Sequence, residues 1–98
     1  MCSYDPQRVR PGAIRWALYC HEIARGIHRQ KALDKRYAIL VVCPVCHDDL
    51  DNTAAWPEAR QLAFLNLSRP DDLDIPAYNA LVGWGPHRIT ERDVEEAG

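Results

Sequence analysis

Hydrophobic residues gather in two short segments in the first half of the chain, and their patterns differ. Residues 39–42 form a continuous apolar run rich in β-branched side chains, which predicts a buried strand. Residues 14–23 fit two structures. Alternate residues from Ile14 onward would share one face of a strand, whereas Ile14, Ala17 and Leu18 would share one face of a helix. The hydrophobic pattern alone leaves both structures open for this segment.

The second half of the chain predicts a series of short helices. Three aspartates follow residue 47, and acidic side chains stabilise a helix N-terminus, so we expect a helix to begin at about that residue. Pro57 and Pro76 suit the first turn of two more helices, and Thr90 can cap a last one, with Asp93 returning the hydrogen bond. The three later helices are predicted at residues 58–67, 77–82 and 91–97.

Size and composition indicate one folded domain, residues 1–98. A chain of 98 residues is near the lower size at which a hydrophobic core suffices, and a bound metal would help. With 47% hydrophobic and 27% charged residues, the chain is not of the disordered class. We expect no membrane association, because no apolar run approaches the roughly 18 residues of a span and the first residues lack signal-peptide features. The expected location is therefore the cytoplasm, where the four cysteines would stay reduced and suit metal binding.

The net charge of −2 conceals a basic half and an acidic half. Residues 8–36 carry eight Arg or Lys against two acids, whereas residues 48–98 carry eleven acids against four arginines. A basic surface beside a metal site suits a phosphate backbone, although the same charges also fit an ordinary solvated face. The acidic half could dock a partner protein or keep the domain soluble.

The candidate chemistry centres on residues 43–47, Cys-Pro-Val-Cys-His, directly after the apolar run. Two thiols at C-x-x-C spacing can bind one Zn²⁺ from a single tight turn. A structural zinc site needs four ligands, so Cys43 and Cys46 would require two more, for which Cys20 and Cys2 are the candidates. A pair of buried, reduced thiols is the alternative that the pattern leaves open.

A second polar cluster, Cys20-His21-Glu22, lies upstream and could meet the first in space. Hydrolysis of a phosphodiester needs a base that activates water and a cation that neutralises charge on the phosphate. His21 and His47 could hold that cation, while Glu22 acts as the base or as a further ligand. Two surface histidines and an ion-paired glutamate are the alternative interpretation of the same residues.

The order of these motifs resembles the HNH (ββα-metal, His-Me finger) endonuclease family, and in particular small HNH-like proteins of phages and bacteria. That family has a strand ending in a His-His-Ile or Asp-His-Ile motif, a loop, an apolar strand, and then C-x-x-C-His opening a helix. Here the tripeptide 21–23 (His-Glu-Ile) matches the first motif and residues 40–47 match the last. The resemblance covers roughly residues 16–65 and favours a strand for 14–23.

This resemblance implies an α+β fold in which residues 14–55 form a ββα-metal core with a treble-clef-type zinc knuckle and 56–98 form a helical extension. It implies a metal-dependent DNA endonuclease of a prokaryotic or phage-infected cell, with structural Zn²⁺ and catalytic Mg²⁺ or Mn²⁺. The catalytic residues would be His21, Glu22 and His47. The expected contacts with the DNA backbone come from Arg25, Arg29, Lys31, Lys35 and Arg36.

Three departures from the family pattern support an alternative function. Glu22 stands at the usual position of the general-base histidine, and no asparagine occurs between His21 and His47. The first C-x-x-C of the zinc-containing members is also absent. The alternative is a catalytically inactive zinc-knuckle module that binds DNA or protein.

Overall fold

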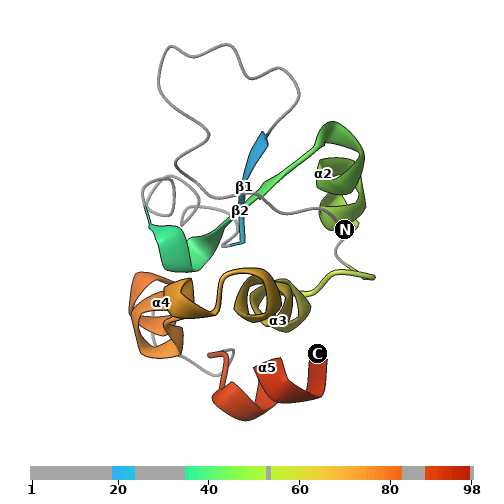
Figure 1. Cartoon of the computed structure of the whole chain (residues 1–98). Coiled ribbons are helices and arrows are strands. Elements are labelled where there is room, and N and C mark those ends of the chain that lie inside the picture. The colour runs from blue at the N-terminus through green and yellow to red at the C-terminus, as the bar shows by residue number, and fades with distance from the viewer. Residues whose placement is uncertain (1–18, 24–34, 53, 83–87, 98) are drawn as a thin grey trace.

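The computed structural model describes residues 19–23, 35–52, 54–82 and 88–97 (Figure 1). The strands β1 (Tyr19–Glu22) and β2 (Ile39–Val42) form a two-stranded antiparallel sheet, and helix α2 (Pro44–Asp51) follows β2 after one residue. The described part of the chain is therefore a small α+β fold. The strand predicted at 39–42 is confirmed, and the strand predicted at 14–23 is confirmed over β1, while residues 14–18 lie outside the described residues.

The register of the sheet decides which side chains can meet. His21 is paired with Leu40, and Tyr19 is paired with Val42. Cross-strand partners share a face and neighbours along a strand alternate, so these four residues lie on one face and Glu22 lies on the other. Leu40 and Val42 belong to the hydrophobic core. The His21 side chain therefore lies on the face of the sheet that packs against the hydrophobic core.

Helix α2 begins at Pro44, earlier than the predicted start at about residue 47. Cys43 is extended and occupies the N-cap position, and Pro44 stands at the first helical position, where its fixed φ angle fits and its missing N–H is no loss. The prediction placed the start too late because it weighed the aspartates and not this proline. The earlier start puts His47 one turn inside the helix.

The later helices agree closely with the predictions. Helix α3 (Glu58–Ser68) has Pro57 as its N-cap, and α4 (Ile75–Val82) begins two residues before its predicted start. Helix α5 (Glu91–Ala97) has the predicted capping box. The Asp93 N–H donates to Thr90 Oγ1 at 3.1 Å, and the Thr90 N–H donates to Asp93 Oδ2 at 2.9 Å. No described helix is long and apolar enough to cross a membrane.

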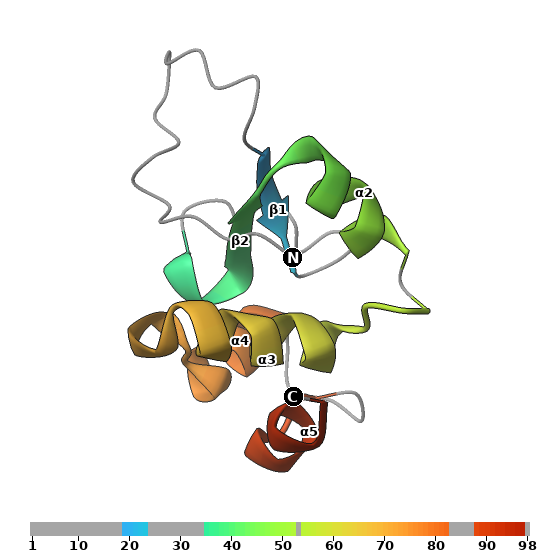
Figure 2. The ribbon, with the colours of Figure 1, turned by 45° about the vertical axis from the view of Figure 1, so that its right-hand side comes forward.

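One hydrophobic cluster joins the sheet to the helices. Helix α3 lies between the sheet and α5 in both ribbon views (Figures 1 and 2). It contributes Leu62 and Leu65, both fully buried. The buried members of the cluster are Ile23, Ala38, Leu40, Val42, Leu50, Leu62, Leu65, Ile75, Tyr78 and Val94.

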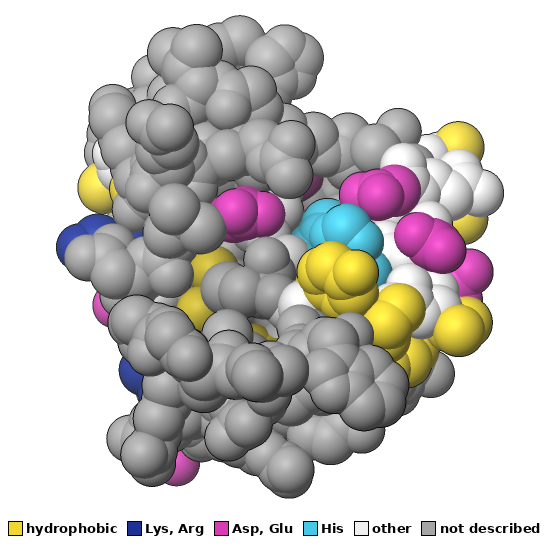
Figure 3. Space-filling model, turned by 90° about the horizontal axis from the view of Figure 1, so that it is seen from above, with side chains coloured by type: hydrophobic (Ala, Val, Ile, Leu, Met, Phe, Trp, Pro, Cys, Tyr) yellow, Lys and Arg dark blue, Asp and Glu magenta, His cyan; other side chains and the backbone are white. Residues whose placement is uncertain are grey.

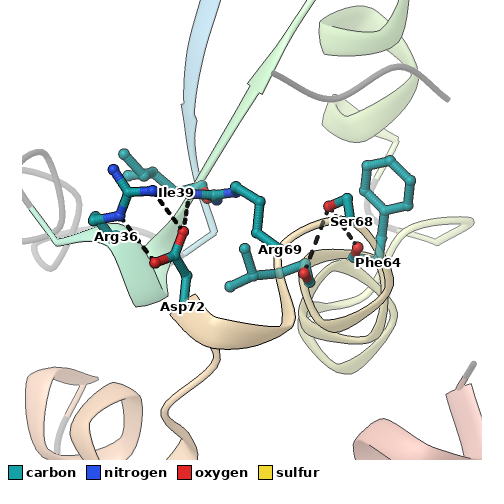
Figure 4. Close-up of polar contacts among 7 residues, drawn as sticks. Arg36, Ile39, Phe64, Ser68, Arg69 and Asp72 are labelled. Atoms are coloured by element: carbon teal, nitrogen blue, oxygen red, sulfur yellow. Dashed lines mark hydrogen bonds and ion pairs between the residues drawn. The ribbon is translucent and has the colours of Figure 1, made fainter. Parts of the chain in front are cut away.

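An ionic network fastens the helical half to the start of β2 (Figure 4). It involves the 3-10 turns η3 (Arg36–Ala38) and η4 (Pro70–Asp72). Arg36 donates two hydrogen bonds of 2.9 Å to the Asp72 carboxylate, and Arg69 donates a third to the same group at 3.0 Å. Arg69 also donates to the backbone carbonyl of Ile39. The single carboxylate of Asp72 thus bridges two guanidinium groups beside the sheet.

Candidate metal centre

The sheet and α2 bring the two sequence motifs together. The possible ligand atoms of His21, His47 and Asp51 all lie within 4.8 Å of one another, so this group could hold a metal ion. The rings of the two histidines meet edge to face, with centroids 5.4 Å apart. This closeness follows from the order of elements, because β1 runs beside β2 and α2 leaves β2 at once and turns back towards β1.

Asp51 joins the group through the geometry of the helix. It follows His47 by four residues, which puts both side chains on one face of α2, and His47 Nδ1 lies 3.9 Å from Asp51 Oδ2. The Asp51 side chain is 62% exposed and has room to adjust its torsion angles towards an ion. In the sequence, Asp51 is one of the three aspartates that predicted the start of a helix, and no metal-binding role was predicted for it. The His-x-x-x-Asp spacing was the signal that could have identified it as a ligand.

Tyr19 is a second residue that sequence analysis did not assign to the site. It stands two positions before His21 on the same face of β1. Its ring stacks on His47, with centroids 5.0 Å apart and an interplanar angle of 20°. This contact restrains the orientation of the imidazole. Finding it required the strand register, which the sequence does not state.

One ring nitrogen of His21 has a hydrogen-bond partner, and the other has none in the described part of the chain. The residue is 6% exposed, and its Nε2 lies 2.8 Å from Gln61 Oε1 on α3. Its Nδ1 is buried and has no hydrogen-bond partner among the described residues. A buried polar nitrogen in that state destabilises a protein, and a metal ion would satisfy it. The donor set therefore fits a divalent cation.

The electrostatic surroundings of His21 favour its neutral form. Burial lowers the pKa of His21 below its ordinary value of 6.5, and the neighbouring His47 acts in the same direction. The hydrogen bond to Gln61 opposes the shift, as do the charges of Asp51 and Glu22, but the net direction is downward. Only a neutral imidazole can ligate a metal. His21 is therefore kept in the form that binding requires.

The predicted zinc knuckle has two described thiols. Cys43 is the N-cap residue of α2, and Cys46 packs against the hydrophobic core; both are half-buried and not joined in a disulfide. Within the described ranges, no third histidine, cysteine or carboxylate gathers with these two sulfurs. Cys2 and the side chain of Cys20 lie outside the described residues. The four-ligand zinc site stays a prediction.

Glu22, the predicted base, is not among the three gathered residues. It follows His21 directly, so it lies on the opposite face of β1. Its charge still acts on His21, where it is the smallest of the influences that raise the pKa. Glu22 is therefore beside the metal group but separated from it by the strand.

Two of the five bases predicted to contact DNA are described. Arg36 is committed to the ion pair with Asp72, although 42% of its side chain is exposed. Lys35 is half-buried immediately before it. Arg25, Arg29 and Lys31 lie outside the described residues. The structure thus describes only the end of the predicted basic surface.

Acidic side chains lie on either side of the site on the described surface (Figure 3). Figure 3 shows histidine side chains reaching the surface between acidic ones. Asp48, Asp49 and Asp51 are all exposed on α2. These charges would repel an incoming phosphate, and a bound divalent cation would offset that repulsion.

No protein-family model, curated protein or solved structure gives a significant match to this chain.

Proposed function

We propose that the protein is a divalent-metal-dependent DNA endonuclease of the HNH type. One observation carries the proposal: His21 and His47, 26 positions apart in the sequence, lie edge to face beside a shared carboxylate. The succession of β1, β2 and α2 supports a ββα-metal core, because a hairpin followed by a helix is the framework that the motif order implied.

In this proposal His21, His47 and Asp51 hold the ion. Two imidazoles and a carboxylate suit Mn²⁺, Ni²⁺ or Zn²⁺ better than Mg²⁺, because imidazole nitrogen favours transition metals. When bound, the cation would supply positive charge that stabilises the scissile phosphate and the departing oxygen. Tyr19 restrains the His47 ring by stacking, and Gln61 contacts the His21 ring, so both imidazoles are positioned in advance.

Glu22 serves as the general base. It takes one proton from a water molecule while the water oxygen forms a bond to phosphorus and the bond from phosphorus to the leaving sugar oxygen breaks. The leaving oxygen takes a proton from solvent. Because Glu22 and His21 lie on opposite faces of β1, the phosphate must approach across the edge of the strand to meet both.

The alternative function, a catalytically inactive module that binds DNA or protein, is favoured by one specific observation. Glu22 is not part of the group of His21, His47 and Asp51. A site that holds an ion but lacks a positioned base would bind a phosphate backbone without cleaving it. The two functions therefore differ in turnover and share metal binding.

The decisive experiment is nicking of supercoiled plasmid by the full chain with Mn²⁺, Ni²⁺, Zn²⁺ or Mg²⁺. We expect His47→Ala to lose more activity than the roughly 10–100-fold that removal of an outer-shell partner costs, because it removes a ligand itself. Asp49→Asn is the matched control, since Asp49 is an exposed acid on the same helix outside the metal group.

Each outcome of this experiment has a clear meaning. Wild-type nicking that disappears in His47→Ala and persists in Asp49→Asn supports the endonuclease. Nicking that survives in His47→Ala contradicts the site. Metal-dependent DNA binding by the wild type, with no cleavage under any of the four metals, replaces the endonuclease with the binding module.

A further inference from the structure

Gln61 connects the helical half of the protein to His21, and both ends of its amide group are occupied. The residue lies on α3 and is 1% exposed. Its Nε2 donates to the backbone carbonyl of Trp56 at 2.8 Å, and its Oε1 lies 2.8 Å from His21 Nε2. Trp56 is itself held by a cation–π contact with Arg60, at 3.9 Å, and by the ring of Phe64.

The Trp56 carbonyl fixes which way the Gln61 amide points. A carbonyl oxygen only accepts hydrogen bonds, so the amide atom facing it must be the nitrogen. The other amide atom, facing His21, is then the oxygen, which also only accepts. His21 Nε2 must therefore carry a proton and donate it to Gln61 Oε1.

A protonated Nε2 in a neutral imidazole leaves the lone pair on Nδ1. His21 Nδ1 is buried without a partner in the described part of the chain, and the His47 ring meets the His21 ring edge to face. The lone pair is thus on the nitrogen that hydrogen bonding has left open. The hydrogen bond to Gln61 Oε1 also increases the basicity of the ring.

We infer that Gln61 is a positioning residue that fixes the Nε2–H tautomer of His21 and presents Nδ1 as the metal-binding atom. This inference rests on the metal site of the proposed function but not on DNA cleavage. It makes α3 a part of the metal centre, because the α3 side chain determines which imidazole nitrogen is available. Gln61 itself touches neither the ion nor the substrate.

The test is ¹⁵N NMR of the histidine rings in the metal-free protein at mildly alkaline pH, with calorimetric titration of Zn²⁺ and Mn²⁺. We expect wild-type His21 to show a protonated Nε2 and an unprotonated Nδ1. In Gln61→Leu the ring should become a mixture of tautomers, and metal affinity should fall about 10–100-fold. Asn66→Leu, an amide-to-leucine change at an exposed position of α3, is the matched control and should leave both unchanged.

Gln61→Glu separates the hydrogen bond from the packing. Both Gln61 variants lose the bond to the Trp56 carbonyl, but glutamate keeps an acceptor that can face His21 Nε2. We expect Gln61→Glu to retain the Nε2–H tautomer and to bind metal more tightly than Gln61→Leu. An equal loss of metal affinity in Gln61→Leu and Gln61→Glu would overturn the inference. So would a protonated Nδ1 on His21 in the wild type. The NMR and calorimetric results test the role of Gln61 whether or not the protein nicks plasmid.

Discussion

Two buried polar side chains, Asn79 in the helical region (α3 to α5) and His21 in the proposed metal-binding region (β1 with α2), differ in whether their hydrogen bonds are satisfied. In the helical region Asn79 is buried but satisfied, since its amide donates to the Ile89 carbonyl at 2.6 Å and accepts from the Ile89 N–H at 2.9 Å. In the metal-binding region His21 Nδ1 is buried without a partner in the described part of the chain. A hydrogen-bonded buried group stabilises a fold, whereas a buried polar atom without a partner lowers stability and is expected mainly at functional sites.

The two regions nevertheless share one hydrophobic core and are linked by hydrogen bonds. The hydrophobic cluster includes Leu40 and Val42 from the sheet as well as residues of α3, α4 and α5. The network around Asp72 fastens η4 to β2 from one side, and the hydrogen bond from His21 to Gln61 joins the regions from within the core. The helical region thus packs against the strand that carries His21 and contacts its ring.

The largest expected effect is a loss of stability from the helical region. Leu65→Ala removes a fully buried side chain of α3, and such truncations cost about 2–5 kcal/mol. His47→Ala in the metal-free protein should cost about 1 kcal/mol or less, because His47 is partly exposed and loses mainly its contact with Tyr19. Urea denaturation in the presence of a chelator measures both. Equal losses of unfolding free energy in Leu65→Ala and His47→Ala would remove the distinction between a stabilising region and a functional one.

A smaller effect is expected at the start of α5. Thr90→Ala deletes the hydroxyl that accepts the Asp93 N–H, and losses of this kind cost about 1 kcal/mol. The metal affinity of this variant should equal that of the wild type, because α5 contributes no ligand. Glu95→Ala, an exposed change on the same helix, serves as the control for both urea denaturation and metal titration. A fall in metal affinity in Thr90→Ala would show that helix capping is coupled to the site.

Sequence patterns predicted the elements well but only part of the site. The capping box of Thr90 and the strand at 39–42 are local features, so the signals for them lie within a few residues. His21 and His47 were identified because each belongs to a compact motif. Gln61 and Tyr19 were missed because their roles depend on which strand and helix faces meet, and that is set by packing. Glu22 was placed with the histidines by adjacency in sequence, whereas strand alternation separates it from His21.

The smallest expected effect is a dependence of stability on pH that arises from His21. Burial lowers the pKa of His21 in the folded protein below the unfolded value of about 6.5. As the pH falls below 6.5, the unfolded chain takes up a proton at His21 before the folded protein does, so the free energy of unfolding decreases. This decrease in the free energy of unfolding is complete once the pH is below the lowered pKa of the folded state. At pH values well above 6.5, His21 causes no such decrease. Chelator-treated protein should therefore lose stability as the pH falls through about 6.5, in the interval above the range in which most carboxylates titrate.

A pair of variants assigns that loss to its source. His21→Gln removes the titrating group and should flatten the dependence over this interval. Thr90→Ala should lower stability at every pH in the interval while keeping the wild-type slope, because the pKa of Asp93, its capping partner, is lowered below the ordinary value of 3.8 by its hydrogen bonds to Thr90. Asp93 then affects stability only in more acidic solution. An unchanged slope in His21→Gln would contradict this prediction, because it would mean that a group other than His21 causes the acid sensitivity.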